Sequence, residues 1–126
     1  MSKLKNLPYS IINIYPFGSQ LAVYFDSNEY QSACKELGQD IEMNDKMYGG
    51  TTSSIEFDGV NYFLVHLLPS AKMNIIYHES LHAAWYLLDH HGVYLCADAN
   101  ETLAYMQGYI ADQLFEILVK YRKENK

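Results

Sequence analysis

The sequence is poor in basic residues and has no long apolar run, and each shortage excludes a class of protein. Its 126 residues include nine Lys and Arg against 15 Asp and Glu, giving a formal net charge of −6. Because nucleic-acid binders carry a basic face, we expect no nucleic-acid partner. No apolar run approaches the roughly 18 residues that a membrane span requires, and Met1–Pro8 lacks the apolar segment of a signal peptide. We therefore expect a cytoplasmic protein with no membrane partner.

Cysteine is also scarce, which argues against a disulfide scaffold. Cys34 and Cys96 are the two cysteines and form no CxxC motif, so we expect reduced, buried thiols. What is abundant is apolar: 49% of the residues are hydrophobic and 19% are charged. Such a chain is folded rather than disordered, and its length predicts a single domain over residues 1–126.

The apolar pattern predicts strands in the first half of the chain and two long helices in the second. Asp58-Gly59 between two apolar runs is a strong signal for a β-hairpin. Gly38 and Gly92 mark helix ends. The predicted order is ββαββαα, an α+β domain with a small antiparallel sheet. The expected strands cover residues 10–15, 20–25, 51–57 and 60–67, and the expected helices cover 28–37, 72–91 and 99–123.

The residues that indicate chemistry are His78-Glu79-Ser80-Leu81-His82, an HExxH motif inside a predicted helix. Residues i and i+4 share a helix face, so the imidazoles of His78 and His82 can reach one metal ion. Glu79 then lies beside the metal, where it can take a proton from an attacking water. The motif therefore predicts a zinc site with Glu79 as general base.

A catalytic zinc needs a third protein ligand, and Glu101 is the candidate. Eighteen residues separate it from His82, which gives HExxH-x18-E. The helix continues for about 13 Å beyond His82, and the link over residues 92–100 spans up to roughly 30 Å. A second helix can therefore return alongside the first with Glu101 level with His82. Ala104 and Gly108 share the Glu101 face and are small enough for close helix packing.

This pattern resembles the gluzincin branch of the zincin metallopeptidases, which includes thermolysin, and small cytosolic or phage-borne HExxH proteins. The resemblance covers about 30 residues, and the strand-rich first half is also zincin-like. It implies zinc-dependent hydrolysis of a peptide or protein substrate, with His78, His82 and Glu101 as ligands and Glu79 as base. The expected single domain leaves no second domain to wall a cleft, and Tyr105 stands where thermolysin-like members have Asp. On chemical grounds, an oxyanion stabiliser or substrate contact is sought at Tyr105, Tyr109 and His66.

Two supporting features are expected around this site. An edge strand within residues 51–67 would bind an extended peptide by β-augmentation. The segment 39–50, rich in polar residues and glycine, is expected to form a surface loop that acts as a lid. Trp85, Tyr86 and Leu88 are expected in the core.

Several alternatives stay open at this point. Asp98 with Glu101 resembles a capping box, which would use Glu101 for backbone hydrogen bonding. If the second helix packs differently, Asp89 or His90 would replace Glu101 as ligand, although histidine at a helix C-terminus is commonly a cap. The alternative function is a metal-binding interaction protein on a zincin scaffold with little or no turnover. The sequence predicts no oligomeric state.

Overall fold

The structure is a computed structural model that describes residues 4–41 and 49–126. Within them, four strands and three α-helices follow one another in the predicted ββαββαα order, with a short 3-10 turn, η1, before the last helix. The α+β class is confirmed. The strands are β1 (Ser10–Ile14), β2 (Ser19–Tyr24), β3 (Gly50–Phe57) and β4 (Val60–Leu67), and the helices are α1 (Ser27–Glu36), α2 (Met73–His90), η1 (Ala97–Ala99) and α3 (Asn100–Glu124).

The four strands form one mixed sheet in the order β1-β2-β4-β3. The outer pairs are antiparallel, but β2 and β4 run parallel, with Leu21 opposite Phe63. The prediction of an antiparallel sheet is therefore wrong for the central pair. α1 and β3 lie between β2 and β4 in the chain, and a connection of that length returns the chain to the end of the sheet where a parallel strand begins. The hairpin then leaves β3 at the edge.

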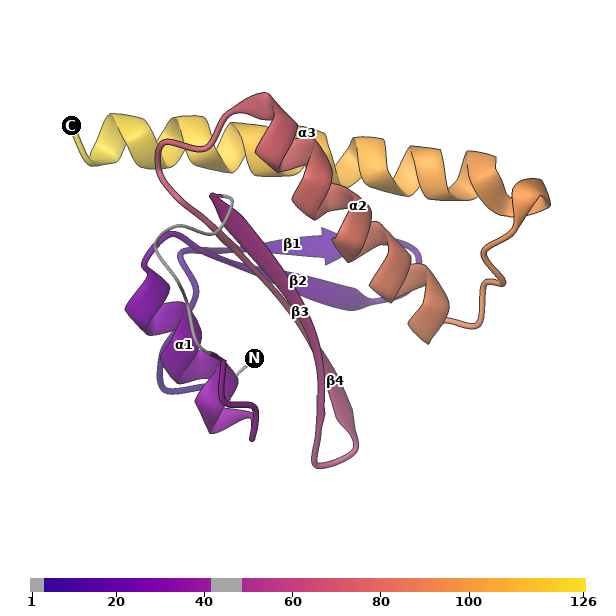
Figure 1. Ribbon diagram of the computed structural model, residues 1–126, viewed down its shortest axis with the longest axis horizontal. Coiled ribbons are helices and arrows are strands. Elements are labelled where there is room, and N and C mark those ends of the chain that lie inside the picture. The colour runs from indigo at the N-terminus through magenta and orange to yellow at the C-terminus, as the bar shows by residue number, and fades with distance from the viewer. Residues whose placement is uncertain (1–3, 42–48) are drawn as a thin grey trace.

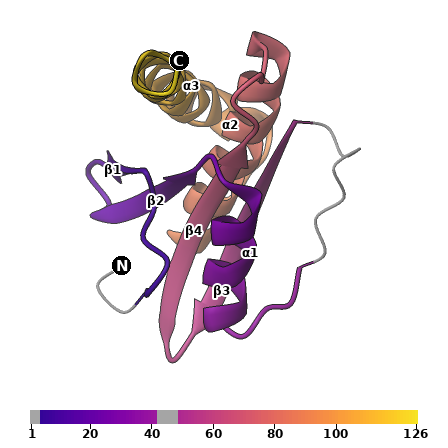
Figure 2. The same cartoon turned by 90° about the vertical axis from the view of Figure 1, so that its left-hand side faces the viewer.

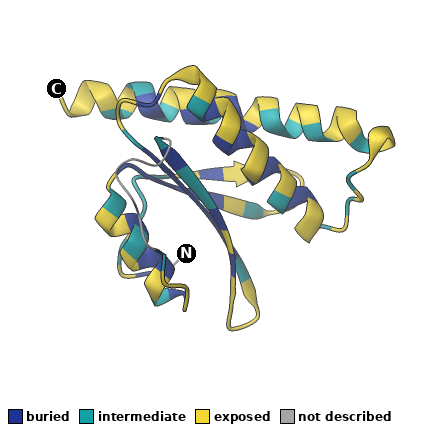
Figure 3. Cartoon of the chain, in the orientation of Figure 1, coloured by how far each residue is buried: buried dark blue, intermediate teal, exposed yellow. Residues whose placement is uncertain are grey.

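Helices cover both faces of this sheet, α1 on one side and α2 with α3 on the other (Figures 1 and 2). β4 supplies both cores: Phe63 and Val65 pack beneath α2 and α3, whereas Tyr62 and Leu64 pack toward α1. A central strand that is buried on both faces loses the polar alternation of a half-exposed one. α2 and α3 keep their outward faces exposed (Figure 3). No helix in the described part of the chain is both long and apolar enough to cross a bilayer.

The β3–β4 turn confirms the hairpin prediction. Asp58 and Gly59 both have positive φ, 55° and 77°, as a two-residue type I′ turn requires. The cysteine prediction is only half right. Both thiols are free and Cys34 is buried, but Cys96 is exposed, because it lies in the link before η1 rather than on a core-facing element. Of the predicted lid, residues 42–48 lie outside the described residues, and Gly50 belongs to β3.

Candidate metal centre

The HExxH motif lies in the first half of α2, on a helix that its apolar residues fix against the sheet. Ile76, Ala83 and Leu87 face the core, which turns His78 and His82 outward. The two imidazoles meet, with their Nε2 atoms 3.1 Å apart and their ring centroids 4.7 Å apart. This is the i, i+4 juxtaposition that the sequence predicted.

The Glu79 side chain is buried, unlike the two imidazoles, because it lies against the edge strand β3. Its exposed fraction is 2%, whereas the His78 side chain is 61% exposed. The hydroxyl of Thr52 on β3 donates to Glu79 Oε1 at 2.7 Å and lies 3.3 Å from the Glu79 carbonyl oxygen. The other carboxylate oxygen, Oε2, is 3.9 Å from His78 Nε2. One oxygen is therefore held by β3 and the other faces the imidazole pair.

Gly50 makes room for this carboxylate. A Cβ added there would be 2.8 Å from Glu79 Cγ and 3.1 Å from Ile75 Cγ2. Distances below 3.0 Å are steric overlap, so any larger residue would push the Glu79 side chain or the strand away. The first residue of β3 and the second residue of the motif are thus fitted to each other, although 29 positions separate them.

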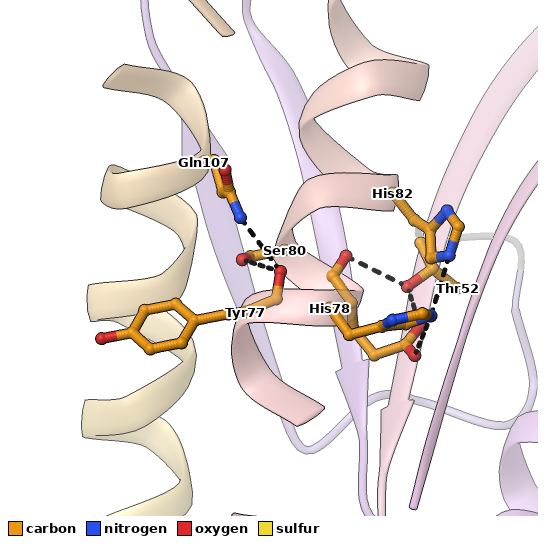
Figure 4. A network of polar contacts seen from close by, with 7 residues as sticks. Thr52, Tyr77, His78, Ser80, His82 and Gln107 are labelled. Atoms are coloured by element: carbon orange, nitrogen blue, oxygen red, sulfur yellow. Dashed lines mark hydrogen bonds and ion pairs between the residues drawn. The ribbon is translucent and has the colours of Figure 1, made fainter. Parts of the chain in front are cut away.

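A shallow depression of about 170 Å³ opens between β3 and α2 at this point. Figure 4 shows His78 and His82 turned toward Thr52, while Gln107 of α3 lies on the other side of α2. Tyr86 stacks near His82, with centroids 6.2 Å apart. The depression is lined by Gly50, Thr51 and Thr52 of β3 and by His78, Glu79, His82 and Tyr86 of α2.

Glu101 does not join the pair in this structure. It is exposed in the first turn of α3, and α3 packs on α2 from the side away from the histidines, where Gln107 Nε2 donates to Tyr77 O at 3.1 Å. Ala104 and Gly108, expected against α2, are exposed. Across residues 4–41 and 49–126, no three His, Cys, Asp or Glu residues are grouped to hold a metal ion.

The competing explanation for Glu101 also finds no support. α3 begins after Ala99, and no side chain caps its N-terminus, so the alternative capping box with Asp98 is not formed. The other ligand candidates lie away from the motif: Asp89 is exposed at the C-terminal end of α2, and His90 Nδ1 lies 2.6 Å from Asn61 Nδ2. His90 therefore ties α2 to β4, and neither residue approaches the motif.

The structure places His66 on the opposite face of the sheet. Its neighbour Val65 packs toward α2, so His66 packs toward α1, with its ring 5.6 Å from that of Tyr30. It is 2% exposed, and neither ring nitrogen has a hydrogen-bond partner among the described residues. Burial lowers the pKa of this imidazole. His66 thus lies outside the candidate site.

Tyr105 and Tyr109 also lie away from the imidazole pair. They line a separate groove between α3 and the β1–β2 turn, and the Tyr109 hydroxyl donates to Asn13 O at 2.9 Å. Of the three aromatic or apolar residues expected in the core, Leu88 is buried and Tyr86 is half-buried, but Trp85 is 46% exposed. The outward face of α2 is thus more apolar than expected.

Sequence reasoning missed Thr52 and Gly50. The signal that could have found them is the motif itself, since a carboxylate that is buried in a helix needs a donor from whichever strand covers it. No protein-family model matches the sequence, and searches of curated proteins and of solved structures found no match. What the site can do is therefore argued from its own geometry. It offers two adjacent imidazole nitrogens to a metal ion and a carboxylate oxygen beside them.

Proposed function

We propose that this chain is a zinc-dependent peptide hydrolase of minimal zincin type, with His78 and His82 as metal ligands and Glu79 as general base. One observation carries the proposal: the His78 and His82 Nε2 atoms lie 3.1 Å apart. Two nitrogens bound at 2.0–2.1 Å to a tetrahedral zinc ion are about 3.3 Å apart. The donor pair therefore fits zinc with a shift of a few tenths of an ångström.

A zinc ion at this pair would polarise a peptide carbonyl and lower the pKa of a water toward neutrality. The Oε2 atom of Glu79 would accept a proton from the attacking water. Glu79 would then deliver this proton to the leaving amine. Thr52 supports this role because its hydrogen bond holds Oε1, while Oε2 lies 3.9 Å from His78 Nε2. The fixed position of the base reduces the reorganisation needed during the reaction.

The edge strand would bring the substrate to this base. Within the described residues β3 pairs only with β4, so its outer edge has no neighbouring strand. An extended peptide that adds to this edge by β-augmentation would run past the depression between β3 and α2. Its carbonyl groups would then pass close to His78 and Glu79.

Glu101 remains our proposal for the third ligand, and it requires the start of α3 to approach α2. The alternative function, a metal-binding interaction protein with little turnover, is favoured by a specific observation: Tyr105, Tyr109 and His66, the residues sought as oxyanion stabilisers, all lie away from the imidazole pair. Both functions require bound zinc. Turnover therefore separates them.

The test measures zinc content and peptide hydrolysis on the same untagged protein samples. We expect about one zinc per wild-type chain and its loss in His78→Ala and His82→Ala. Glu79→Gln should keep zinc, because a Gln carbonyl can still accept the Thr52 hydrogen bond, but should lose turnover of casein and of a peptide library by about 100-fold or more. His90→Ala is the matched control, since His90 lies on the same helix and contacts Asn61.

The results of these measurements distinguish the hydrolase from the interaction protein. Zinc binding without cleavage of any peptide would support the interaction protein. Full hydrolysis by Glu79→Gln would refute its role as base. No zinc in the wild type, even after zinc is added back, would refute both functions. Loss of zinc in Glu101→Ala would support Glu101 as the third ligand, whereas unchanged affinity would exclude it.

A further inference from the structure

A second hollow lies on the flank of α3, between that helix and the β1–β2 turn. Its volume is about 500 Å³, roughly three times that of the depression beside the histidines, and the two share no residue. Its walls are almost entirely aromatic or apolar, and we call it the tyrosine groove. The residues used below are Tyr15, Pro16 and Phe17 of the turn and Tyr105, Met106 and Tyr109 of α3.

Part of the tyrosine groove is held in place before any ligand arrives. Tyr109 is fixed by its hydrogen bond to Asn13 O, 2.9 Å. Phe17 stacks on His91 with centroids 4.4 Å apart, and His91 Nε2 lies 2.7 Å from Ser19 Oγ. Rings that are already ordered lose little side-chain entropy on binding, so a preformed wall favours a ligand.

The other walls present free aromatic surface. Tyr15 and Tyr105 are 76% and 77% exposed, among the highest values for large hydrophobic residues in the described chain. They belong to the turn and to α3 respectively, so they stand on the two sides of the tyrosine groove. Single exposed apolar residues are normal, but two tyrosines flanking one apolar hollow indicate a ligand site.

The charge of the residues around the tyrosine groove favours a cationic ligand. The sequence has no Lys or Arg over residues 6–34 or 73–119, the two stretches that build the tyrosine groove. One acidic residue is a helix neighbour of a tyrosine in the groove wall: Asp112 follows Tyr109 by three residues on α3 and is exposed. Residues three and four apart are neighbours on a helix surface. The tyrosine groove thus has an acidic helix neighbour and no basic residue in the stretches that build it.

We propose that the tyrosine groove binds an arginine or lysine side chain of a polypeptide partner. The cation would lie over the faces of Tyr15 and Tyr105, where the ring quadrupole attracts positive charge. The apolar stem of the same side chain would lie along Pro16 and Met106. Arginine should bind better than lysine, since its planar guanidinium stacks on aromatic rings.

The probe is the pentapeptide acetyl-Ala-Leu-Arg-Leu-Ala-amide, matched by the same peptide with citrulline, a neutral isostere of arginine. Both are titrated to 10 mM into the 15N-labelled full chain with chelator present, followed by amide chemical shifts. We expect the arginine peptide to shift Phe17, Tyr105 and Met106, and to bind about 3- to 30-fold more tightly than the citrulline peptide. Added salt at 0.5 M should reduce that difference.

Variants locate the binding. Tyr105→Ala and Asp112→Asn should each weaken the arginine peptide and leave the fold intact, because both side chains are exposed. Phe115→Ala is the matched control, being a 43% exposed aromatic on α3 outside the tyrosine groove. Equal affinity for the two peptides, shifts confined to other surfaces, or no shift at 10 mM would each overturn the proposal. Chelator keeps this result independent of the proposed metal site.

Discussion

Replacing Gly50 with alanine should destabilise the protein through a contact that the structure gives directly. The new Cβ would meet Glu79 Cγ at 2.8 Å, Ile75 Cγ2 at 3.1 Å and the His66 carbonyl oxygen at 3.2 Å. Overpacking of this kind costs about 1–3 kcal/mol. A Gly→Ala change also restricts the unfolded chain, which returns about 0.4–1 kcal/mol. The expected net loss is therefore about 0–2.6 kcal/mol, with a midpoint of about 1.3 kcal/mol and with Glu79 displaced from Thr52.

The matched control is Gly108→Ala on α3. No atom lies within 4 Å of the Cβ that it would add, and alanine is favoured over glycine inside a helix by about 1 kcal/mol. We expect urea unfolding to show Gly50→Ala less stable and Gly108→Ala more stable than the wild type. Peptide hydrolysis should fall in the first variant alone. A Gly50→Ala protein that is more stable than the wild type, as Gly108→Ala is expected to be, would refute the fit between β3 and Glu79.

Three further predictions follow from single contacts. Thr52→Val should lower stability by about 1–3 kcal/mol, because the buried Glu79 carboxylate loses its donor, and Thr52→Ser should restore most of it in the same urea titration. Below pH 6.5 the unfolded chain protonates His66 before the fold does, since burial lowers the pKa in the fold. The free energy of unfolding should therefore decrease as the pH is lowered below 6.5, by up to about 1.4 kcal/mol per pH unit. His66→Leu should make the free energy of unfolding less dependent on pH than in the wild type. Arg122 Nε and Nη2 donate to Pro69 O and Ala71 O, both at 2.7 Å. Arg122→Ala should lower the melting temperature by several degrees, and an unchanged value would contradict that anchoring role.

The sequence was sufficient for features that depend on local chemistry. The Asp58-Gly59 turn has the two positive φ angles that its residues favour. The i, i+4 spacing brought His78 and His82 together once the segment was helical. Each of these depends on fewer than six consecutive residues. Tertiary packing could change the turn conformation or the position of the two imidazoles only by breaking the hairpin or the helix.

Features that depend on distant segments were beyond the sequence. The parallel pairing of β2 with β4 joins residues 42 positions apart. The apolar pattern of two strands does not indicate whether they pair in parallel or antiparallel. The sequence also did not show which face of the sheet His66 occupies. β4 is buried on both sides, so its residues show no polar alternation from which to read a face. The position of Glu101 depends on the rotation of α3, which Gln107 and the apolar residues behind it set against α2.

The contrast between an exposed imidazole pair and the buried Glu79 carboxylate determines how experiments on this site can be interpreted. His78 and His82 are on the surface, so their removal should change stability by no more than about 0.5 kcal/mol in the absence of metal. Glu79, Thr52 and Gly50 form a packed contact, so most changes there alter stability and chemistry together. Glu79→Gln is the exception because it keeps both the volume and the hydrogen bond. A loss of turnover in that variant, at unchanged stability and zinc content, can therefore be assigned to the missing carboxylate alone.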